Sequence, residues 1–188
     1  RTELEKYKAL SLRLGQWKIN YNRERVDSSG KQQFVERSIV NRIFTIDRQA
    51  GAQLYGHLFP GTFADMRYWA GVYTGLGRGV EVNDDDNMMF SGRIQWNFLG
   101  RDLAFSQSDI SFHEEPTGSI AGAISTNIGP CTRWSSSGCG SLDGFSLGGP
   151  SQFRIDQWVE EFAFKYQGLS IQHEFHWKQI EDRENGIE

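Results

Sequence analysis

The sequence has no long apolar run, few cysteines and no block of positive charge. No stretch of about 18 consecutive apolar residues occurs, which excludes a membrane-spanning helix. The net charge is -4 and no Lys/Arg cluster stands out, so nucleic-acid binding is disfavoured. The sequence also lacks a Gly-x-Ser-x-Gly motif, a phosphate loop and a metal-binding helix motif. We therefore expect neither an enzyme nor a bound cofactor or metal.

The only two cysteines, Cys131 and Cys139, lie in a Gly/Ser-rich stretch within 128–153. A local disulfide between them would stabilise a long loop and indicate an oxidising compartment. The alternative is two free thiols in a cytosolic loop. The absence of paired histidines nearby argues against a zinc site.

What the sequence does contain is β-forming residues in alternating patterns. It has 21 glycines and 13% aromatic residues, which favours an all-β fold. Met88 to Phe98 and Leu169 to Lys178 both alternate, with nonpolar side chains on one face and polar ones on the other. Membrane β-barrels need only about 9 to 11 alternating residues per strand. The pattern therefore predicts a transmembrane antiparallel β-barrel.

Seven strands are predicted, and their connections differ in length. The strands span 10–19, 44–58, 67–74, 88–98, 119–127, 154–166 and 169–179. A bulge near Gly15 would explain a slip of phase in the first strand, and the last two form a hairpin at Gln167-Gly168.

The long connections are 20–43, 75–87 and 128–153, whereas 59–66 and 167–168 are short. In outer-membrane barrels, long loops on the outer side likewise alternate with short turns on the inner side. The irregular stretch 99–118 is the exception to this alternation. Single-chain bacterial barrels have an even number of strands. We therefore interpret 1–188 as part of one barrel domain in a longer chain.

Six segments in order resemble the phosphate-selective porin O and P family. They are Leu12–Lys18, Phe34–Ser38, Asp47–Gly51 with Leu54 and Gly56, Ala70–Gly75, Arg93–Gly100, and Phe164–Gly168 followed by Gln172–Trp177. The resemblance implies a sixteen-stranded barrel in the outer membrane of a Gram-negative bacterium, usually a homotrimer. It also implies a water-filled pore constricted by inward loops, contact with outer-membrane lipid and lipopolysaccharide, and passive diffusion of small, phosphate-like anions.

Basic side chains on the polar strand faces are the candidates for anion contact. They are Arg13, Lys18, Arg48, Arg93, Lys165 and Lys178. In the family that this sequence resembles, basic side chains form a ladder that guides anions, and Lys18, Arg37, Arg48 and Arg93 fall within the matching segments. With Lys165, these four are the predicted pore-lining residues. The alternative is that such an arginine pairs with a neighbouring carboxylate, such as Glu36, Asp47, Glu161 or Glu174, and braces the wall.

Other functions remain open on the sequence alone. Asp84, Asp85 and Asp86 could bind calcium or bridge lipopolysaccharide, although a solvated acidic loop is favoured because the spacing lacks an EF-hand pattern. The chain could also be a secreted β-sandwich whose exposed Trp and Tyr side chains bind carbohydrate. A third alternative is a plugged barrel that serves as a structural component of an envelope assembly.

Overall fold

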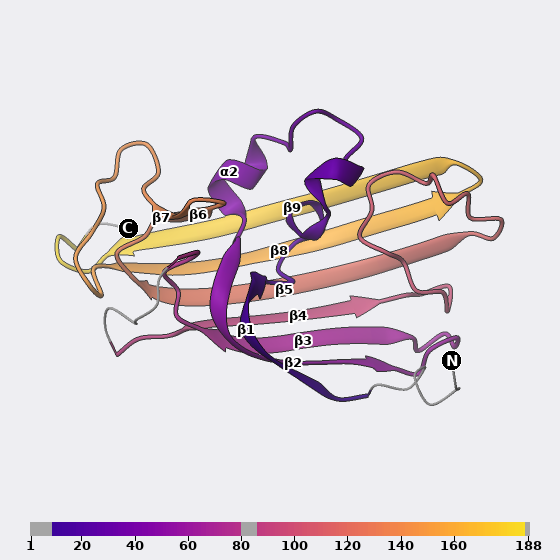
Figure 1. The fold of residues 1–188 in the computed structure, drawn as a ribbon, viewed down its shortest axis with the longest axis horizontal. Coiled ribbons are helices and arrows are strands. Elements are labelled where there is room, and N and C mark those ends of the chain that lie inside the picture. The colour runs from indigo at the N-terminus through magenta and orange to yellow at the C-terminus, as the bar shows by residue number, and fades with distance from the viewer. Residues whose placement is uncertain (1–8, 80–85, 187–188) are drawn as a thin grey trace.

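The computed structural model describes residues 9–79 and 86–186, and its main element is one antiparallel sheet (Figure 1). Its seven strands, adjacent in chain order, are β1 (Ser11–Lys18), β2 (Arg48–Leu58), β3 (Met66–Tyr73), β4 (Met89–Trp96), β5 (Thr117–Gly129), β8 (Phe153–Tyr166) and β9 (Leu169–Asp182). A separate hairpin is formed by β6 (Arg133–Ser135) and β7 (Gly138–Gly140). The described residues are mostly β and antiparallel, which confirms this part of the predicted fold and not the closed barrel. Within the described residues the sheet is open, with β1 and β9 at its edges.

The long β1–β2 connection contains short helices where only a loop was expected. Between β1 and β2 lie α1 (Arg23–Val26), the 3₁₀ helix η2 (Ser29–Lys31) and α2 (Val40–Phe44). Figure 1 shows this segment crossing one face of the sheet, with α2 beside the β6–β7 hairpin. Among the described residues, no helix has both the length and the apolar character needed to cross a membrane.

The hairpin of β8 and β9 forms as its sequence predicts. Tyr166 pairs with Leu169, and the two residues between them, Gln167 and Gly168, have φ of 47° and 86°. Positive φ at both positions matches the right-handed twist of the flanking strands. The turn therefore fixes the register along both fourteen-residue strands.

The predicted bulge at Gly15 is wrong. Residues of β1 and β2 pair one to one from Ser11 with Tyr55 to Lys18 with Arg48. Gly15 instead adopts a φ of 119°, which suits glycine because it has no Cβ. The alternation of β1 therefore continues unbroken to its last residue.

The two faces of the sheet differ in the polarity and in the exposure of their side chains. On the nonpolar face, the large exposed side chains are Leu12, Leu14, Leu54, Phe90, Ile94, Ile120, Ile124, Trp158, Phe162, Ile171, Phe175 and Trp177. On the polar face, the buried side chains include Gln49, Gln53, Arg93, Gln95, Ser119, Ser125, Asn127, Gln157, Glu161 and Lys165. Ile124 is 67% exposed, whereas Arg93 is 4% exposed.

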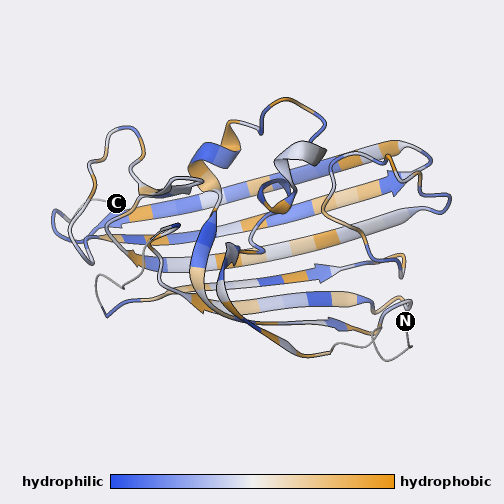
Figure 2. Cartoon of the chain, viewed as in Figure 1, coloured by the Kyte–Doolittle hydropathy of each residue, from blue (hydrophilic) through white to orange (hydrophobic). Residues whose placement is uncertain are grey.

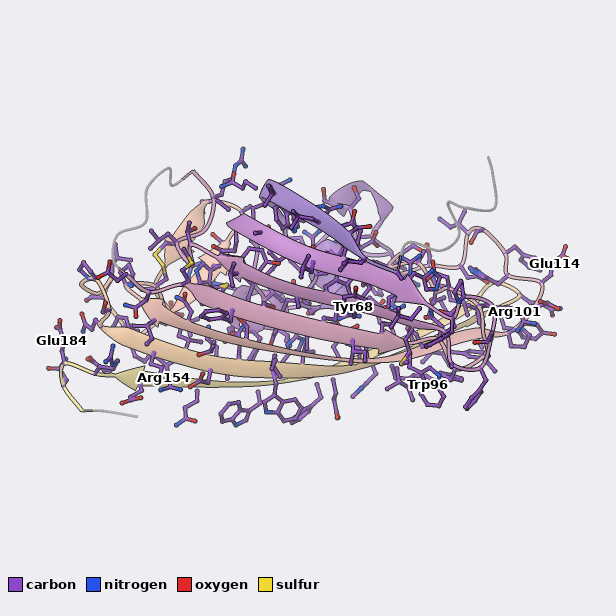
Figure 3. The ribbon with its side chains drawn as sticks, turned by 90° about the horizontal axis from the view of Figure 1, so that it is seen from below. Tyr68, Trp96, Arg101, Glu114, Arg154 and Glu184 are labelled. Atoms are coloured by element: carbon purple, nitrogen blue, oxygen red, sulfur yellow. A yellow bond between two sulfur atoms is a disulfide. The ribbon has the colours of Figure 1, made fainter. Side chains whose placement is uncertain are left out.

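The figures show the same arrangement. Figure 2 shows hydrophobic and hydrophilic residues interleaved along the strands. In Figure 3, Trp96 lies among side chains that project from one side of the sheet, and the Phe63 ring packs against it. Glu160 and His173 share the nonpolar face with these side chains near the β9 edge.

The polar face is covered by the chain's own connections, and a small core lies between them. Ile19, Tyr21 and Ile46 from the β1–β2 connection pack with Tyr73, Met89, Trp134 and Ile155. A disulfide joins Cys131 to Cys139 across the β6–β7 hairpin, which confirms the predicted bond. The Trp134 indole donates a hydrogen bond to the Gly75 carbonyl. The hairpin is thereby held over the sheet.

Candidate functional site

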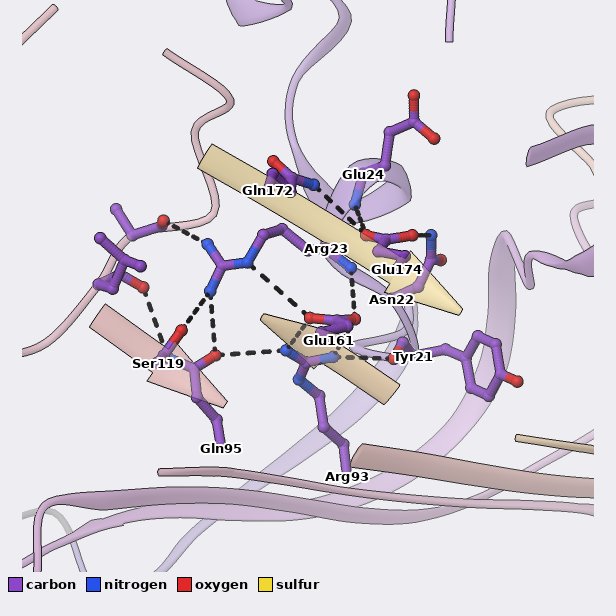
Figure 4. Close-up of polar contacts among 12 residues, drawn as sticks. Tyr21, Asn22, Arg23, Glu24, Arg93, Gln95, Ser119, Glu161, Gln172 and Glu174 are labelled. Carbon is purple, nitrogen blue, oxygen red and sulfur yellow. Dashed lines mark hydrogen bonds and ion pairs between the residues drawn. The ribbon is translucent and has the colours of Figure 1, made fainter. Parts of the chain in front are cut away.

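A buried ion-pair network joins the sheet to the β1–β2 connection (Figure 4). Arg93 on β4 donates from both terminal nitrogens to the two carboxylate oxygens of Glu161 on β8, at 2.6 and 2.7 Å. The backbone N–H of Arg23 in α1 donates to the same carboxylate at 2.8 Å, and the Arg23 Nε lies 3.8 Å from it. This pairing makes the burial of three charged side chains tolerable.

The Arg23 side chain extends the network to a second covering segment. It donates to the Ala104 carbonyl at 2.6 Å and to the Ser119 hydroxyl at 3.1 Å. The Phe105 ring lies 5.1 Å from the Arg23 guanidinium and 5.3 Å from that of Arg93. Burial lowers the pKa of Arg23 to about 10, although the Glu161 carboxylate acts in the opposite direction. Arg23 therefore ties both covering segments to the polar face.

Two lysines of the polar face are likewise engaged by covering segments. Lys165 Nζ donates to the Ser106 hydroxyl at 2.6 Å and to the Ser108 carbonyl at 2.9 Å. Lys178 Nζ donates to the carbonyls of Ile43 and Thr132, at 3.1 and 2.6 Å. Arg93 and Lys165, predicted to line the pore, thus lie beneath the connections, where Arg93 also donates to the Tyr21 carbonyl at 2.9 Å.

Lys18 and Arg48 do not lie on the polar face as predicted. They pair directly across β1 and β2, and alternation places them on the side of Leu12, Leu14 and Leu54. The expected bulge near Gly15 would have reversed the placement of Lys18, and it is absent. Arg48 follows the alternation of β2, in which Gln49 and Gln53 are the buried side chains. Among the described residues, neither the Lys18 nor the Arg48 side chain forms a hydrogen bond or an ion pair.

Arg37 lines an open cavity of about 360 Å³, together with Arg25, Arg42, Arg133 and the carboxylate of Glu36. We call this cavity the arginine pocket. Arg37 donates to the backbone carbonyls of Glu24 and Asp27, at 3.2 and 2.8 Å. Burial, and then the positive charge of Arg25, lowers the pKa of Arg37.

Two of the pocket's guanidinium groups keep donors available. Arg133 uses only its Nε, which donates to the Ser141 carbonyl at 2.7 Å. Arg42 lies 3.8 Å from the Asp143 carboxylate, and both side chains are exposed. A guanidinium with free terminal nitrogens binds carboxylate or phosphate oxygens well. The geometry of the pocket thus suits a small anion.

Sequence reasoning missed Arg25, Arg42 and Arg133 because they lie in connections without periodic patterns. Their proximity depends on the fold of 19–47 and on the disulfide-closed hairpin. Of the acidic loop, Asp84 and Asp85 lie outside the described residues, so the proposed cation site stays a prediction. Within 9–79 and 86–186, no group of three or more His, Cys, Asp or Glu side chains is placed to hold a metal ion.

Comparison with known proteins found no matching family model, no matching curated protein and no matching solved structure.

Proposed function

We propose that this chain forms part of the wall of an outer-membrane β-barrel channel of the porin kind, through which small anions diffuse. The observation that carries the proposal is the orientation of the sheet: large apolar side chains are exposed on one face, while Arg93, Glu161 and Lys165 are buried on the other. A sheet in water usually has the opposite arrangement, with its nonpolar face on the core.

Lipid is the environment that best suits the nonpolar face. Soluble monomers rarely expose contiguous apolar patches larger than a few hundred Å², whereas this face runs from Leu12 on β1 to Trp177 on β9. Within a bilayer every backbone N–H and C=O must find a partner, so open sheet edges are not tolerated. We therefore propose that further strands pair with β1 and β9 and close a barrel.

The arginine pocket supports selectivity for anions. Four guanidinium groups and one carboxylate line it. Arg25 is paired with the Asp47 carboxylate and Arg42 lies near Asp143, whereas Arg37 and Arg133 form no ion pair among the described residues and leave the pocket with an excess of positive charge. Such an excess raises the local concentration of anions and lowers that of cations. The disulfide is compatible with an envelope location, because such bonds persist in oxidising compartments. The trimeric state and the phosphate-like solute remain expectations from the family resemblance.

A second candidate function is a plugged barrel with a structural role. The connections 19–47 and 97–116 cover much of the polar face, and Arg23 fixes both of them to the sheet through Glu161 and Ser119. If these segments also fill the remaining lumen, the barrel would not conduct. Conductance separates the two functions.

The test is reconstitution into lipid vesicles, followed by measurement of conductance and of reversal potential in a chloride gradient. We expect insertion, single-channel currents and an anion-selective reversal potential. R37Q/R42Q is expected to shift the reversal potential toward zero, whereas R101Q, which removes an exposed arginine paired with Glu115, is the matched control. Insertion without conductance would favour the plugged barrel. A protein that stays soluble without detergent would favour the carbohydrate-binding sandwich and contradict the proposal.

A further inference from the structure

A second open cavity, of about 700 Å³, adjoins the arginine pocket, and we call it the acidic cavity. Its titratable lining residues are Glu24, Glu36, Arg37, His173, Glu174 and His176. With neutral histidines, three carboxylates there face one guanidinium. Glu36, Arg37 and Ser38 line both cavities, which therefore meet along this short segment. Two cavities of opposite charge thus lie side by side.

Glu36 is the carboxylate of the acidic cavity that is available to a ligand. Glu24 accepts hydrogen bonds from the backbone N–H and the hydroxyl of Ser38, at 2.8 and 2.6 Å. Glu174 accepts from the backbone N–H of Glu24 at 2.7 Å and from the Asn22 amide at 3.0 Å (Figure 4). The Glu36 carboxylate is exposed and forms no hydrogen bond or ion pair among the described residues. A ligand cation can therefore contact it directly.

The arginine pocket offers unused donors on the other side of the same segment. Arg37 donates to backbone carbonyls through Nε and Nη2, so its Nη1 has no acceptor among the described residues. Arg133 likewise keeps both terminal nitrogens free. Guanidinium nitrogens bind carboxylate oxygens well. Phe34, which is 72% exposed, and Val40 line the acidic cavity and offer apolar contacts beside the charges.

We propose that the boundary of the two cavities binds a short peptide, with its terminal carboxylate at Arg37 and Arg133 and its terminal ammonium at Glu36. The inference rests on the proposed function and adds a solute class to it. A simple anion satisfies only the arginine pocket and is repelled by the carboxylates next to it. An extended dipeptide separates its charged ends by about 7 Å, so one ligand can contact both cavities where they meet.

The experiment is isothermal titration calorimetry of the detergent-solubilised protein with dialanine, with N-acetyl-dialanine, which lacks the ammonium, and with dialaninamide, which lacks the carboxylate. We expect dialanine to bind at least fivefold more tightly than either blocked peptide. E36Q is expected to weaken dialanine binding at least fivefold and to leave N-acetyl-dialanine binding unchanged. R37Q/R133Q is expected to weaken the binding of both. The matched control is E114Q, which changes an exposed glutamate of the 97–116 connection.

Equal binding of dialanine and N-acetyl-dialanine would overturn the proposal, because it would show a site for the carboxylate alone. So would an E36Q variant that binds both peptides more weakly to the same extent, since a structural defect has that effect. The comparison of the three peptides on the wild-type protein needs no variant to fold. Anion-selective current without dialanine binding would refute the peptide site alone, whereas dialanine binding without conductance would refute the channel alone.

Discussion

Glu161 is the residue on which the contacts between sheet and covering connection depend most. Its carboxylate accepts hydrogen bonds from both terminal nitrogens of Arg93 and from the backbone of Arg23. Both guanidinium groups are nearly inaccessible to water. Removing one member of such a buried pair is costly, because the remaining charge loses its partner without regaining hydration.

We expect E161Q to destabilise the protein by about 3 kcal/mol, since Arg23 and Arg93 would then face a neutral amide. The matched control is E160Q, which changes the neighbouring glutamate on the exposed face of β8 and should have little effect. Urea unfolding in detergent micelles, followed by tryptophan fluorescence, measures the difference. Equal free energies of unfolding for the two variants would show that the network does not stabilise the fold.

At this scale the sequence predicts the face of a residue better than its partners. Alternation correctly places Arg93, Glu161 and Lys165 on the polar face. The sequence leaves open whether such an arginine lines a pore or pairs with a neighbouring carboxylate, and it does not specify which carboxylate pairs with Arg93. Nothing in the pattern predicts that Arg23 joins them, because it lies in an aperiodic connection. Lys18 was misplaced because the phase slip at Trp17 was attributed to a bulge, whereas Trp17 packs on Tyr73 in the small core.

Among the elements, the β6–β7 hairpin links several parts of the chain. Trp134 bonds to Gly75, Lys178 bonds to Thr132, and the hairpin lies beside α2. The hairpin also places Arg133 in the arginine pocket opposite the arginines of 25–42. The Cys131–Cys139 disulfide, between residues eight positions apart, links β7 to the residues just before β6.

We predict that C131S/C139S lowers the free energy of unfolding by about 2.5 kcal/mol, the loss of chain-entropy stabilisation for a loop of this size. Anion selectivity should weaken as well, because Arg133 is no longer held over the pocket. Thermal unfolding with and without dithiothreitol measures the first effect, and reversal potential the second. If dithiothreitol destabilises the double variant as much as the wild type, the disulfide is not the source of the stability.

The strands were largely predictable, while the connections were not. Alternating faces and the Gln167-Gly168 turn specify β4, β8 and β9, because side-chain period and turn chemistry are local properties. The long connections fold through contacts distant in sequence, such as Asn22 with Glu174 and Arg23 with Ala104. No local pattern encodes such contacts. The arginine pocket depends on such contacts, and of its four arginines the sequence analysis therefore identified only Arg37 as a candidate.

For the whole molecule, the proposed channel function depends on what covers the nonpolar face of the sheet. Three connections pack on the polar face, whereas most large side chains of the nonpolar face stay exposed among the described residues. The seven strands expose a continuous row of Leu, Ile, Phe and Trp side chains on the other side. Lipid, a second sheet or another protein would each bury this surface, and each gives a different environment to the same side chains.

The most direct measurement is a nitroxide scan along β5, from 119 to 128, in protein reconstituted into lipid vesicles. Ile120 and Ile124 are exposed there, whereas Ser119 and Ser125 are buried. We predict that labels at even positions collide readily with oxygen, which dissolves in lipid, and poorly with a water-soluble nickel chelate, while odd positions are protected from both. Even positions that are accessible to the nickel chelate, or protected from both reagents, would contradict a lipid-facing sheet.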